Sequence, residues 1–337
     1  MPKRVGTDYA GAAMKRALIT GIGGQDGHYL TELLIGKGYR VYGLAWPGSR
    51  SREAIRREFP DVRLVEGDLG NAASLVRAIA EAQPDEVYNL GGVSTVSESV
   101  RSPVESSDVI GLGALRLLEA VRVAAGANSG IRFYQASSSE MFGVATEKPQ
   151  RETTPFNPRS PYAVAKVFAH HATRYYREAY GLHASSGILF NHESPRRRTD
   201  FVTRKVTKGV ARIALAKADR LTLGGLDARR DWGFAGDYVE AMWLMLQQQE
   251  PDDYVVATGE THTVREFVAE AFAVAGISDW GLHVDVDSAL TRLDDVDMIV
   301  GDASKAREGL GWAPKVSFAE LVRMMVEADI DAEKAAA

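Results

Sequence analysis

From Arg16 onward, short apolar runs alternate with longer amphipathic stretches, and this alternation constrains the fold more than any other feature of the chain. Short apolar runs are typical of buried strands, and amphipathic stretches are typical of helices. Such an alternation builds a parallel sheet with helices on both faces. We therefore predict an α/β fold with a doubly wound, parallel-sheet Rossmann domain. The expected strands are Ala17–Thr20, Arg40–Leu44, Val62–Glu66, Glu86–Leu90, Ile131–Ala136 and His183–Leu189, and the expected helices between them include Tyr29–Lys37, Ala72–Ala82, Gly111–Ala124 and Tyr162–Tyr180.

After Asn191 the rhythm becomes less regular, and we expect a smaller, intermeshed α/β substrate lobe. No long linker separates the two halves, so they are expected to share a cleft. The predicted divisions are a flexible N-terminal extension (1–14), the Rossmann domain (15–190), a mainly substrate-binding lobe (191–330) and a C-terminal tail (331–337). In the second half the expected helices lie near Thr203–Lys217, Asp237–Gln249, Val264–Ala275 and Ser317–Ala328, with short segments at Leu221–Leu223 and Tyr254–Ala257.

The composition argues against several classes of function. A formal net charge of −5 gives no electrostatic reason to expect a nucleic-acid or membrane partner. The chain has no cysteine and its seven histidines show no ligand spacing, so no metal is expected. No segment has the apolar length of a signal peptide or membrane span. We therefore expect a cytoplasmic protein.

A glycine-rich turn follows the first expected strand and opens a helix, in the segment Gly21-Ile22-Gly23-Gly24-Gln25-Asp26-Gly27. Gly21 permits a tight turn, Gly24 lets backbone N–H groups approach a pyrophosphate, and Gly27 allows close packing of helix on strand. The helix N-terminus favours the negative charge of such a group. A glycine turn can also be merely structural, but in this position it favours dinucleotide binding.

The residues after the second and third strands bear on which dinucleotide is bound. An enzyme that uses NAD often has an acid after the second strand, but Leu44-Ala45-Trp46-Pro47 contains none. This favours NADP, while NAD stays open. Arg50 and Arg52 can meet a 2′-phosphate or belong to a solvated face. Asp68 can accept a hydrogen bond from the adenine amino group or simply make a turn.

Tyr162 and Lys166 are one helical turn apart, behind a Ser160 cap and a proline at the first helical position. A nearby ammonium group is expected to lower the pKa of the tyrosine, which can then take a proton from a sugar hydroxyl. Ser138 and Glu140 end the fifth strand, at the edge of the sheet where ligands bind in such folds. Ser138 can bind the same hydroxyl, and Glu140 lies beside the expected oxidation site.

Longer blocks of sequence carry a specific resemblance. They are Tyr88-Asn89-Leu90, Tyr134-Gln135-Ala136-Ser137-Ser138-Ser139-Glu140, Pro155-Phe156-Asn157-Pro158-Arg159-Ser160-Pro161-Tyr162, Gly187-Ile188-Leu189-Phe190-Asn191-His192-Glu193-Ser194-Pro195, Phe201-Val202-Thr203-Arg204-Lys205, Arg230-Asp231-Trp232-Gly233 and Ala257-Thr258-Gly259-Glu260. Together they resemble the GDP-mannose 4,6-dehydratases, a family of extended short-chain dehydrogenases/reductases. The resemblance covers nearly everything from Lys15 to about Met325.

The resemblance implies removal of water from GDP-mannose, with internal hydride transfer from C4 to C6 through bound NADP. The catalytic residues would be Ser138, Glu140, Tyr162 and Lys166, with Glu140 taking the C5 proton. The implied cofactor-binding residues are Gly21, Ile22, Gly23, Gly24, Gln25, Asp26, Asp68, Leu69, Leu90, Gly92, Ser94, Tyr162, Lys166, Leu189, His192 and Arg197. The implied substrate-binding residues are Ser94, Glu140, Asn191, Val202, Lys205, Arg230, Arg292 and Asp295.

Departures from the family pattern keep other readings open. Ser138 stands where threonine is usual, and Trp46 and Pro47 replace a paired arginine that contacts NADP and a neighbouring subunit. A homo-oligomer is expected, either a dimer or a tetramer. One alternative function is an NADP-dependent reductase or epimerase of a nucleotide-linked 4-ketosugar. Another is a noncatalytic protein that has kept the dinucleotide-binding fold.

Overall fold

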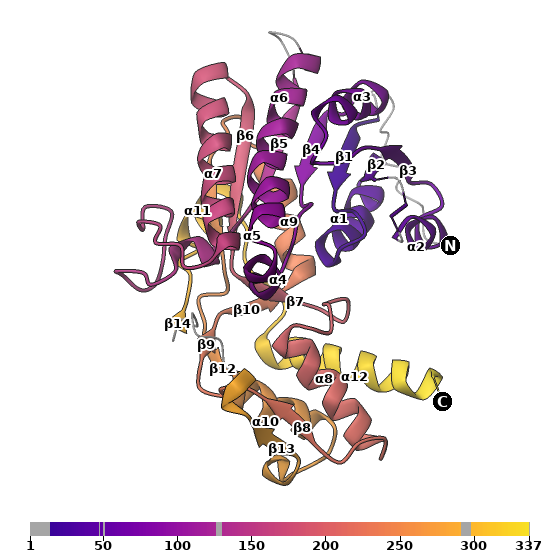
Figure 1. Cartoon of the computed structure of the whole chain (residues 1–337), viewed down its shortest axis with the longest axis vertical. Helices are drawn as coiled ribbons and strands as arrows, with labels where there is room; N and C mark the ends of the chain where they lie inside the picture. Colours follow the sequence, from indigo (N-terminus) through magenta and orange to yellow (C-terminus); the bar gives the residue numbers. More distant parts are fainter. Residues whose placement is uncertain (1–13, 47, 50, 126–129, 291–297, 337) are drawn as a thin grey trace, which may run out of the picture.

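Seven parallel strands form one large sheet in the order β11-β6-β5-β4-β1-β2-β3, as the computed structural model shows (Figure 1). The structure describes residues 14–46, 48–49, 51–125, 130–290 and 298–336. The strands are β1 (Arg16–Thr20), β2 (Arg40–Ala45), β3 (Arg63–Glu66), β4 (Glu86–Asn89), β5 (Arg132–Ser138), β6 (His183–Leu189) and β11 (Asp253–Val256). The order reverses between β1 and β4, which confirms the doubly wound fold.

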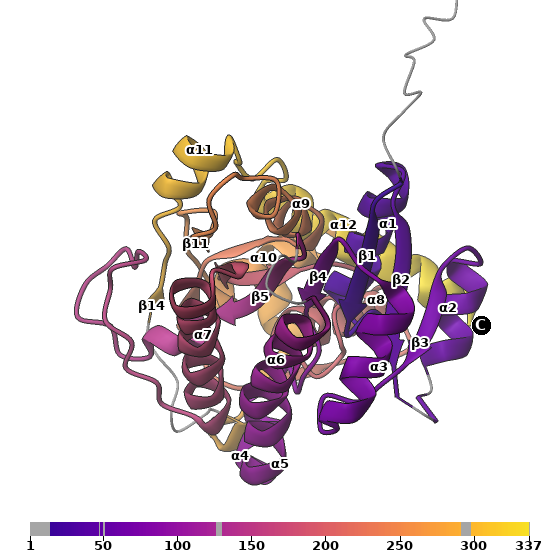
Figure 2. The same cartoon turned by 90° about the horizontal axis from the view of Figure 1, so that it is seen from above.

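Helices cover both faces of this sheet (Figures 1 and 2). On one face lie α3 (Ala72–Ala82), α6 (Gly113–Ala125) and α7 (Pro161–Tyr180), and on the other α1 (Gln25–Gly36), α9 (Ala235–Met245) and α11 (Ser304–Leu310). Successive strand residues alternate between these two layers, because side chains along a strand point to opposite faces. In β1, for example, Leu18 packs in one core and Ile19 in the other. Three shorter helices are α2 (Ser51–Glu58), α4 (Val96–Arg101) and α5 (Pro103–Ser107).

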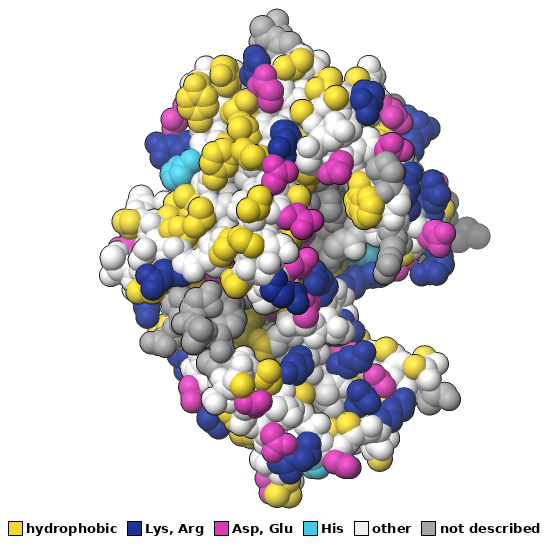
Figure 3. Space-filling model, in the orientation of Figure 1, with side chains coloured by type: hydrophobic (Ala, Val, Ile, Leu, Met, Phe, Trp, Pro, Cys, Tyr) yellow, Lys and Arg dark blue, Asp and Glu magenta, His cyan; other side chains and the backbone are white. Residues whose placement is uncertain are grey.

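The second lobe has a core of its own below the sheet (Figure 1). It is built from α8 (Val202–Ala214), α10 (Val264–Val274) and α12 (Phe318–Ala335), with the paired strands β8 (Leu221–Leu223) and β13 (Val284–Val286). Five short strands join the lobes in two small sheets, β7 (Asn191–Glu193) with β10 (Trp232–Phe234), and β9 (Arg229–Arg230) with β12 (His262–Thr263) and β14 (Met298–Ile299). A notch between the lobes is visible on one edge of the surface (Figure 3).

The two lobes are intermeshed, because the chain returns to the large sheet after entering the second lobe. Strand β11, which the sequence places in the substrate lobe, pairs in parallel with β6 at the edge of the sheet. Asp253 anchors it through two hydrogen bonds from Arg177 on α7, at 3.0 and 2.8 Å. The predicted boundary at residue 190 therefore does not separate two continuous folding units. It stays a proposal about which half of the chain binds which ligand.

Helix α12 runs to Ala335, into the segment expected as a tail from residue 331. Arg204 on α8 binds Asp329 with its Nε and Nη2 atoms at 2.7–3.0 Å, and Thr207 donates to the same carboxylate at 2.7 Å. Asp329 is buried, so both of its oxygens need these partners. This ion pair holds the last turns of α12 against α8.

Replacing Asp329 with alanine is expected to lower the free energy of unfolding by about 3–5 kcal/mol, because it leaves the Arg204 guanidinium largely buried without its partner. Urea denaturation followed by circular dichroism measures the change. Asp331→Ala on the same helix is the control, since Asp331 is 80% exposed. Equal stability of the two variants would contradict this role for the ion pair.

Candidate active site

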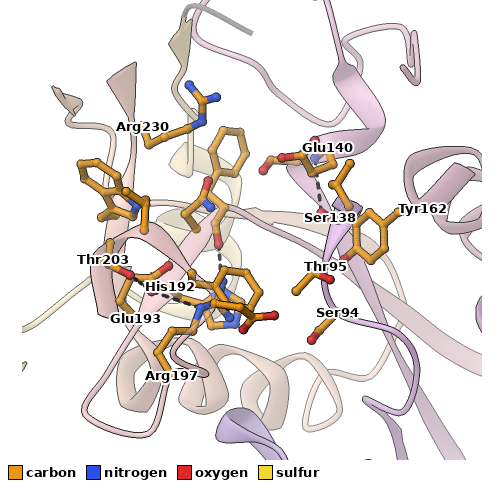
Figure 4. Close-up of a pocket in the computed structure, with 18 of the residues that line it drawn as sticks. Ser94, Thr95, Ser138, Glu140, Tyr162, His192, Glu193, Arg197, Thr203 and Arg230 are labelled. Carbon is orange, nitrogen blue, oxygen red and sulfur yellow. Dashed lines mark hydrogen bonds and ion pairs between the residues drawn. The ribbon is translucent and has the colours of Figure 1, made fainter. Parts of the chain in front are cut away.

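A cavity of about 460 Å³ lies at the carboxyl end of β4, β5 and β6, where the large sheet meets the second lobe (Figure 4). Ligands bind at this edge in doubly wound folds. Fifteen of the residues expected from the sequence line it: Asp26, Leu90, Gly92, Ser94, Ser138, Glu140, Tyr162, Lys166, Leu189, Asn191, His192, Arg197, Val202, Lys205 and Arg230. The residues that do not line it are Gly21, Ile22, Gly23, Gly24, Gln25, Asp68 and Leu69. Arg292 and Asp295 lie outside the described residues.

The cavity has two chemically different walls (Figure 4). Ser138, Glu140 and Tyr162 lie together on one wall, which β5 and α7 provide. The opposite wall comes from the start of the second lobe and contributes Arg197 and Arg230. Hydroxyl and carboxyl groups suited to proton transfer therefore face a basic wall suited to anion binding.

Local sequence fixes the position of Tyr162. Ser160 caps α7 by accepting a hydrogen bond from Ala163 N at 3.2 Å, as predicted, and Pro161 occupies the first turn. The backbone N–H of Tyr162 donates to Ser99 Oγ at 3.1 Å. These contacts fix the first turn of α7, so the phenol is directed into the cavity.

Ser138 closes β5 and begins the next turn. Its Oγ accepts a hydrogen bond from Glu140 N at 3.3 Å, so the serine caps the short 3₁₀ helix Ser139–Phe142. The same hydroxyl bonds the phenol of Tyr162 and lowers its pKa. Ser138 thus links the tyrosine to the segment that carries Glu140.

Burial raises the pKa of Tyr162 to about 12 and outweighs the hydrogen bond from Ser138. Glu140 raises this pKa further, and the cation that lowers it is Arg197. Lys166 Nζ lies 5.7 Å from the centre of the tyrosine ring and donates to Ala136 O at 2.8 Å. Burial lowers the pKa of Lys166 to about 8. The pKa of the tyrosine is therefore raised rather than lowered, because desolvation dominates. Assistance from Lys166 stays a prediction.

The glycine turn has the close packing that the sequence predicts. A Cβ on Gly21, where φ is +69°, would lie 2.8 Å from Gly91 N. One on Gly27 would lie 2.5 Å from Gly21 O, so these two positions require glycine. Gly24, the N-cap of α1, has no side-chain cap, and neither does Phe201 at the start of α8. Two helix N-termini near the cavity are therefore available to anions.

Asp26 and His192 form an ion pair between α1 and β7, with 3.0 Å between Oδ2 and Nε2. Burial alone would raise the pKa of Asp26, but the charge and hydrogen bond of His192 hold it at about 2. Burial would lower the pKa of His192, and Asp26 reverses this and raises it. Each charge of the pair therefore stabilises the other, in the carboxylate of Asp26 and the imidazolium of His192.

Two expected contacts with a dinucleotide lie outside the cavity. Asp68 Oδ1 accepts a hydrogen bond from Gly70 N at 2.8 Å, so the carboxylate makes the simple turn that the sequence also allowed. Leu69 is buried in the core below it. After β2, Arg52 Nη1 donates to Ala45 O at 3.2 Å, which holds this arginine at the end of the strand.

Glu193 and Thr203 line the cavity and were missed from the sequence. Glu193 Oε2 lies 3.1 Å from Arg197 Nε and accepts a hydrogen bond from Thr203 Oγ1 at 2.6 Å. The guanidinium of Arg197 also stacks on Phe201, 3.5 Å from the ring centre. The position of Glu193 just after β6 was the available signal, because residues at that edge face the ligand. Together these groups hold Arg197, whose charge lowers the pKa of Tyr162.

Neither a metal-binding cluster nor a membrane-spanning helix is found in the described part of the chain. Its residues contain no group of three or more side chains suited to a metal ion. None of the helices within the described ranges has the length and apolar character needed to cross a bilayer.

Comparisons with known proteins agree with this geometry. Residues 18–325 match the family model described as GDP-mannose 4,6 dehydratase. The chain is 54% identical to GDP-mannose 4,6 dehydratase 1 of Arabidopsis thaliana, over 95% of this chain and 91% of that protein. It is 48% identical to the human GDP-mannose 4,6 dehydratase, over 94% and 91% of the two chains. Among solved structures, the UDP-glucose 4-epimerase of Thermus thermophilus in complex with NAD is similar, with a TM-score of 0.81, 30% identity and 93% and 98% of the two chains covered. The chain belongs to the GDP-mannose 4,6-dehydratase family, and it is an enzyme.

Proposed function

We propose that this enzyme removes water from GDP-mannose to give GDP-4-keto-6-deoxymannose, by internal hydride transfer from C4 to C6 through bound NADP. The observation that carries the proposal is Glu140 on the same wall as Ser138 and Tyr162 (Figure 4). A dehydrogenase or epimerase of a 4-ketosugar needs the serine and tyrosine, but it catalyses no elimination of water across C5 and C6. Family membership points to the same reaction.

The enzyme uses a nicotinamide dinucleotide, which supplies a reversible hydride acceptor when bound. The residues present fit it, because the tight turn at Gly21 leaves the N-terminus of α1 without a side-chain cap. The first turn of this helix can therefore receive the pyrophosphate. Leu90, Gly92 and Leu189 line the cavity and provide contact surface for the rest of the cofactor.

Two side chains divide the proton transfers, and Ser138 supports one of them. Tyr162, hydrogen-bonded to Ser138, takes the proton of the C4 hydroxyl as C4 is oxidised. The new ketone makes the C5 proton acidic, and Glu140 removes it. That proton leaves with the C6 hydroxyl as water, and the proton held by Tyr162 is delivered to C5 when C6 is reduced. The protons and the hydride therefore balance without an added reductant.

The high pKa of Tyr162 means that the tyrosine needs more positive charge before it acts as a base. Lys166, with a pKa near 8, is mostly protonated at neutral pH and supplies positive charge from the same helix. We therefore propose that Lys166 assists Tyr162 in the loaded enzyme.

The diphosphate of the substrate is proposed to bind at the start of α8 and on the basic wall. Val202 and Lys205 lie in the first turn of this helix, and both line the cavity. Arg230 on β9 is 9% exposed and faces the same space (Figure 4). Arginine offers paired donors to phosphate oxygens, and the uncapped helix start adds backbone N–H groups. Asn191 lines the same cavity.

Arg52 is proposed to select NADP over NAD, because it is held at the end of β2 where the adenine ribose is expected. Arg52→Gln should raise the Kd for NADP by about 10- to 100-fold, the loss expected for charge-assisted hydrogen bonds to a phosphate, and leave the Kd for NAD unchanged. Isothermal titration calorimetry measures both values. Arg56→Gln on the exposed side of the same helix is the control. Equal weakening for the two cofactors would contradict this role.

A homo-oligomer, either a dimer or a tetramer, remains our proposal for the assembly. Apolar side chains gather on the outer surface of α5 and α7 (Figure 3). Val104 is 82% exposed and Phe168 is 44% exposed, in the same region as Val164 and Tyr175. Apolar patches of this kind mark protein interaction sites. The cytoplasmic location likewise stays a prediction.

Mass spectrometry of reactions with GDP-, dTDP- and UDP-linked sugars tests the proposed reaction. GDP-mannose, without added reductant, should lose one water and give a 4-keto-6-deoxy product. A chain that consumes NADPH with a ketosugar but leaves GDP-mannose intact is a reductase, and the proposal then fails. Binding of NADP without conversion of any sugar nucleotide would favour a noncatalytic role.

A further inference from the structure

The ion pair between Asp26 and His192 joins the cofactor turn to the first strand of the second lobe, and a neighbouring glutamine strengthens this junction. Gln25 Nε2 donates to His192 O at 3.0 Å and to Asp26 Oδ1 at 3.1 Å. Gln25 Oε1 accepts a hydrogen bond from Ser194 Oγ at 2.8 Å. The side chains of Gln25 and Asp26 therefore bind β7 and the residue that follows it.

His192 is held in a setting that requires both of its ring protons. Nδ1 lies 2.7 Å from the carbonyl oxygen of Phe190, and Nε2 lies 3.0 Å from Asp26 Oδ2. Both neighbours are acceptors, so both ring nitrogens must donate, and only the imidazolium can do this. Loss of one proton would set a nitrogen lone pair against an oxygen and break one of the two bonds.

The charged and titratable groups around the pair come from four segments. Asp26 lies on α1, Arg197 follows β7, and Tyr238 on α9 stacks on the imidazole with 4.8 Å between ring centres. The charge of Asp26 raises the pKa of Tyr162 and that of Lys166, both on α7. Among these groups Asp26 is the one whose charge raises the pKa of His192, whereas Arg197 lowers it.

Asp26 creates an electrostatic problem for the proposed cofactor. It lies in the first turn of α1, whose N-terminus is expected to receive the pyrophosphate, and its side chain is 24% exposed and lines the cavity. A carboxylate there would repel the phosphates unless a cation neutralises it. His192 is that cation, at hydrogen-bond distance.

We propose that Asp26, His192 and Gln25 form a charge-neutral clasp that holds β7 against the cofactor turn and lets the dinucleotide bind beside a carboxylate. The inference rests on the proposed function, since it concerns the cofactor. Protonated His192 closes the clasp and cancels the charge of Asp26. Neutral His192 breaks one hydrogen bond and leaves a net negative charge beside the phosphates.

Thermodynamic linkage between cofactor binding and protonation of His192 gives the sign and size of the change in Kd with pH. A cofactor that binds the protonated clasp more tightly must raise the pKa of His192 when it binds. Its Kd then rises as the pH increases through that pKa, by about tenfold for each unit by which binding raises it. Asp26→Asn keeps an amide of the same shape but removes the charge that raises the pKa of His192. The variant should therefore lose the rise in Kd above about pH 7.

The test is the Kd for NADP between about pH 6 and about pH 9, measured by calorimetry on the full chain. We expect at least a tenfold rise in the wild-type protein that is absent from Asp26→Asn. Titration of NADP itself is common to both proteins and cancels in their comparison. Glu32→Gln is the matched control, because it removes a carboxylate partner of His28 on the same helix, where Glu32 is 53% exposed. Its curve should follow the wild type.

Nuclear magnetic resonance of the His192 ring gives a second test that needs no variant. Its pKa should rise when NADP is added to the wild-type protein. A constant or falling pKa, or the same rise in Kd with pH in Asp26→Asn, would overturn the clasp while the proposed reaction stands. Failure of the wild-type protein to bind NADP at any pH would instead contradict the proposed function.

Discussion

Glu140→Gln should reduce formation of the 4-keto-6-deoxy product by about 100- to 10,000-fold, the range expected when a positioned base is removed. Glutamine keeps the shape of the side chain but cannot take the C5 proton. Oxidation at C4 does not require that proton transfer, so enzyme-bound cofactor should still become reduced when GDP-mannose is added. Mass spectrometry measures the product, and near-ultraviolet absorbance follows the reduced nicotinamide.

Exchange of the C5 hydrogen with solvent shows whether Glu140 acts as a base or only shapes the cavity. In heavy water the wild-type enzyme should place deuterium at C5 of the product, and sugar recovered from Glu140→Gln should carry none. Glu81→Gln, an exposed carboxylate on α3, is the control and should behave as wild type. Solvent deuterium at C5 in the Glu140 variant would show that another group removes this proton.

Tyr162→Phe should block the reaction one step earlier, at the oxidation of C4. Product formation should fall by a factor similar to that expected for Glu140→Gln. Without the phenol the C4 hydroxyl keeps its proton, so no reduced cofactor should appear when GDP-mannose is added. This absence separates the variant from Glu140→Gln. Binding of NADP, measured by calorimetry, should persist, because the change removes one oxygen atom.

The pH dependence of cofactor reduction provides a further check on the tyrosine. A tyrosine whose pKa is raised is mostly protonated at neutral pH, so the rate of C4 oxidation should increase with pH until the phenolate dominates. Stopped-flow absorbance measures this rate in a single turnover. Tyr175→Phe is the control on the same helix, where Tyr175 is 56% exposed. A rate independent of pH below the pKa of Tyr162 would argue against a tyrosine base.

Much of the fold follows from local sequence because the strands carry continuous apolar runs and the helices carry clear start signals. The strand His183–Leu189 and the helix Ala72–Ala82 have the predicted bounds. The return of β11 to the large sheet was not predicted. Short buried strands look alike in any lobe, and the pairing of Asp253 with Arg177 joins residues far apart in the chain.

The candidate site was predicted as a set of residues, but their electrostatics needed three dimensions. Spacing places Tyr162 and Lys166 on one helix face, yet the pKa of the tyrosine depends on burial and on Arg197 from the second lobe. Likewise the glycine turn points to a pyrophosphate, whereas the side chain of Asp26 binds His192. Sequence patterns report neighbours along the chain, and these contacts cross between lobes.

The most direct test of the proposed reaction follows one hydrogen atom. GDP-mannose with deuterium at C4 is converted in ordinary water, and the product is examined by nuclear magnetic resonance. Internal hydride transfer predicts deuterium at C6 of the 4-keto-6-deoxy product and none in free cofactor. Hydrogen from solvent at C6, or deuterium found in released NADPH, would contradict the transfer from C4 to C6 within one active site.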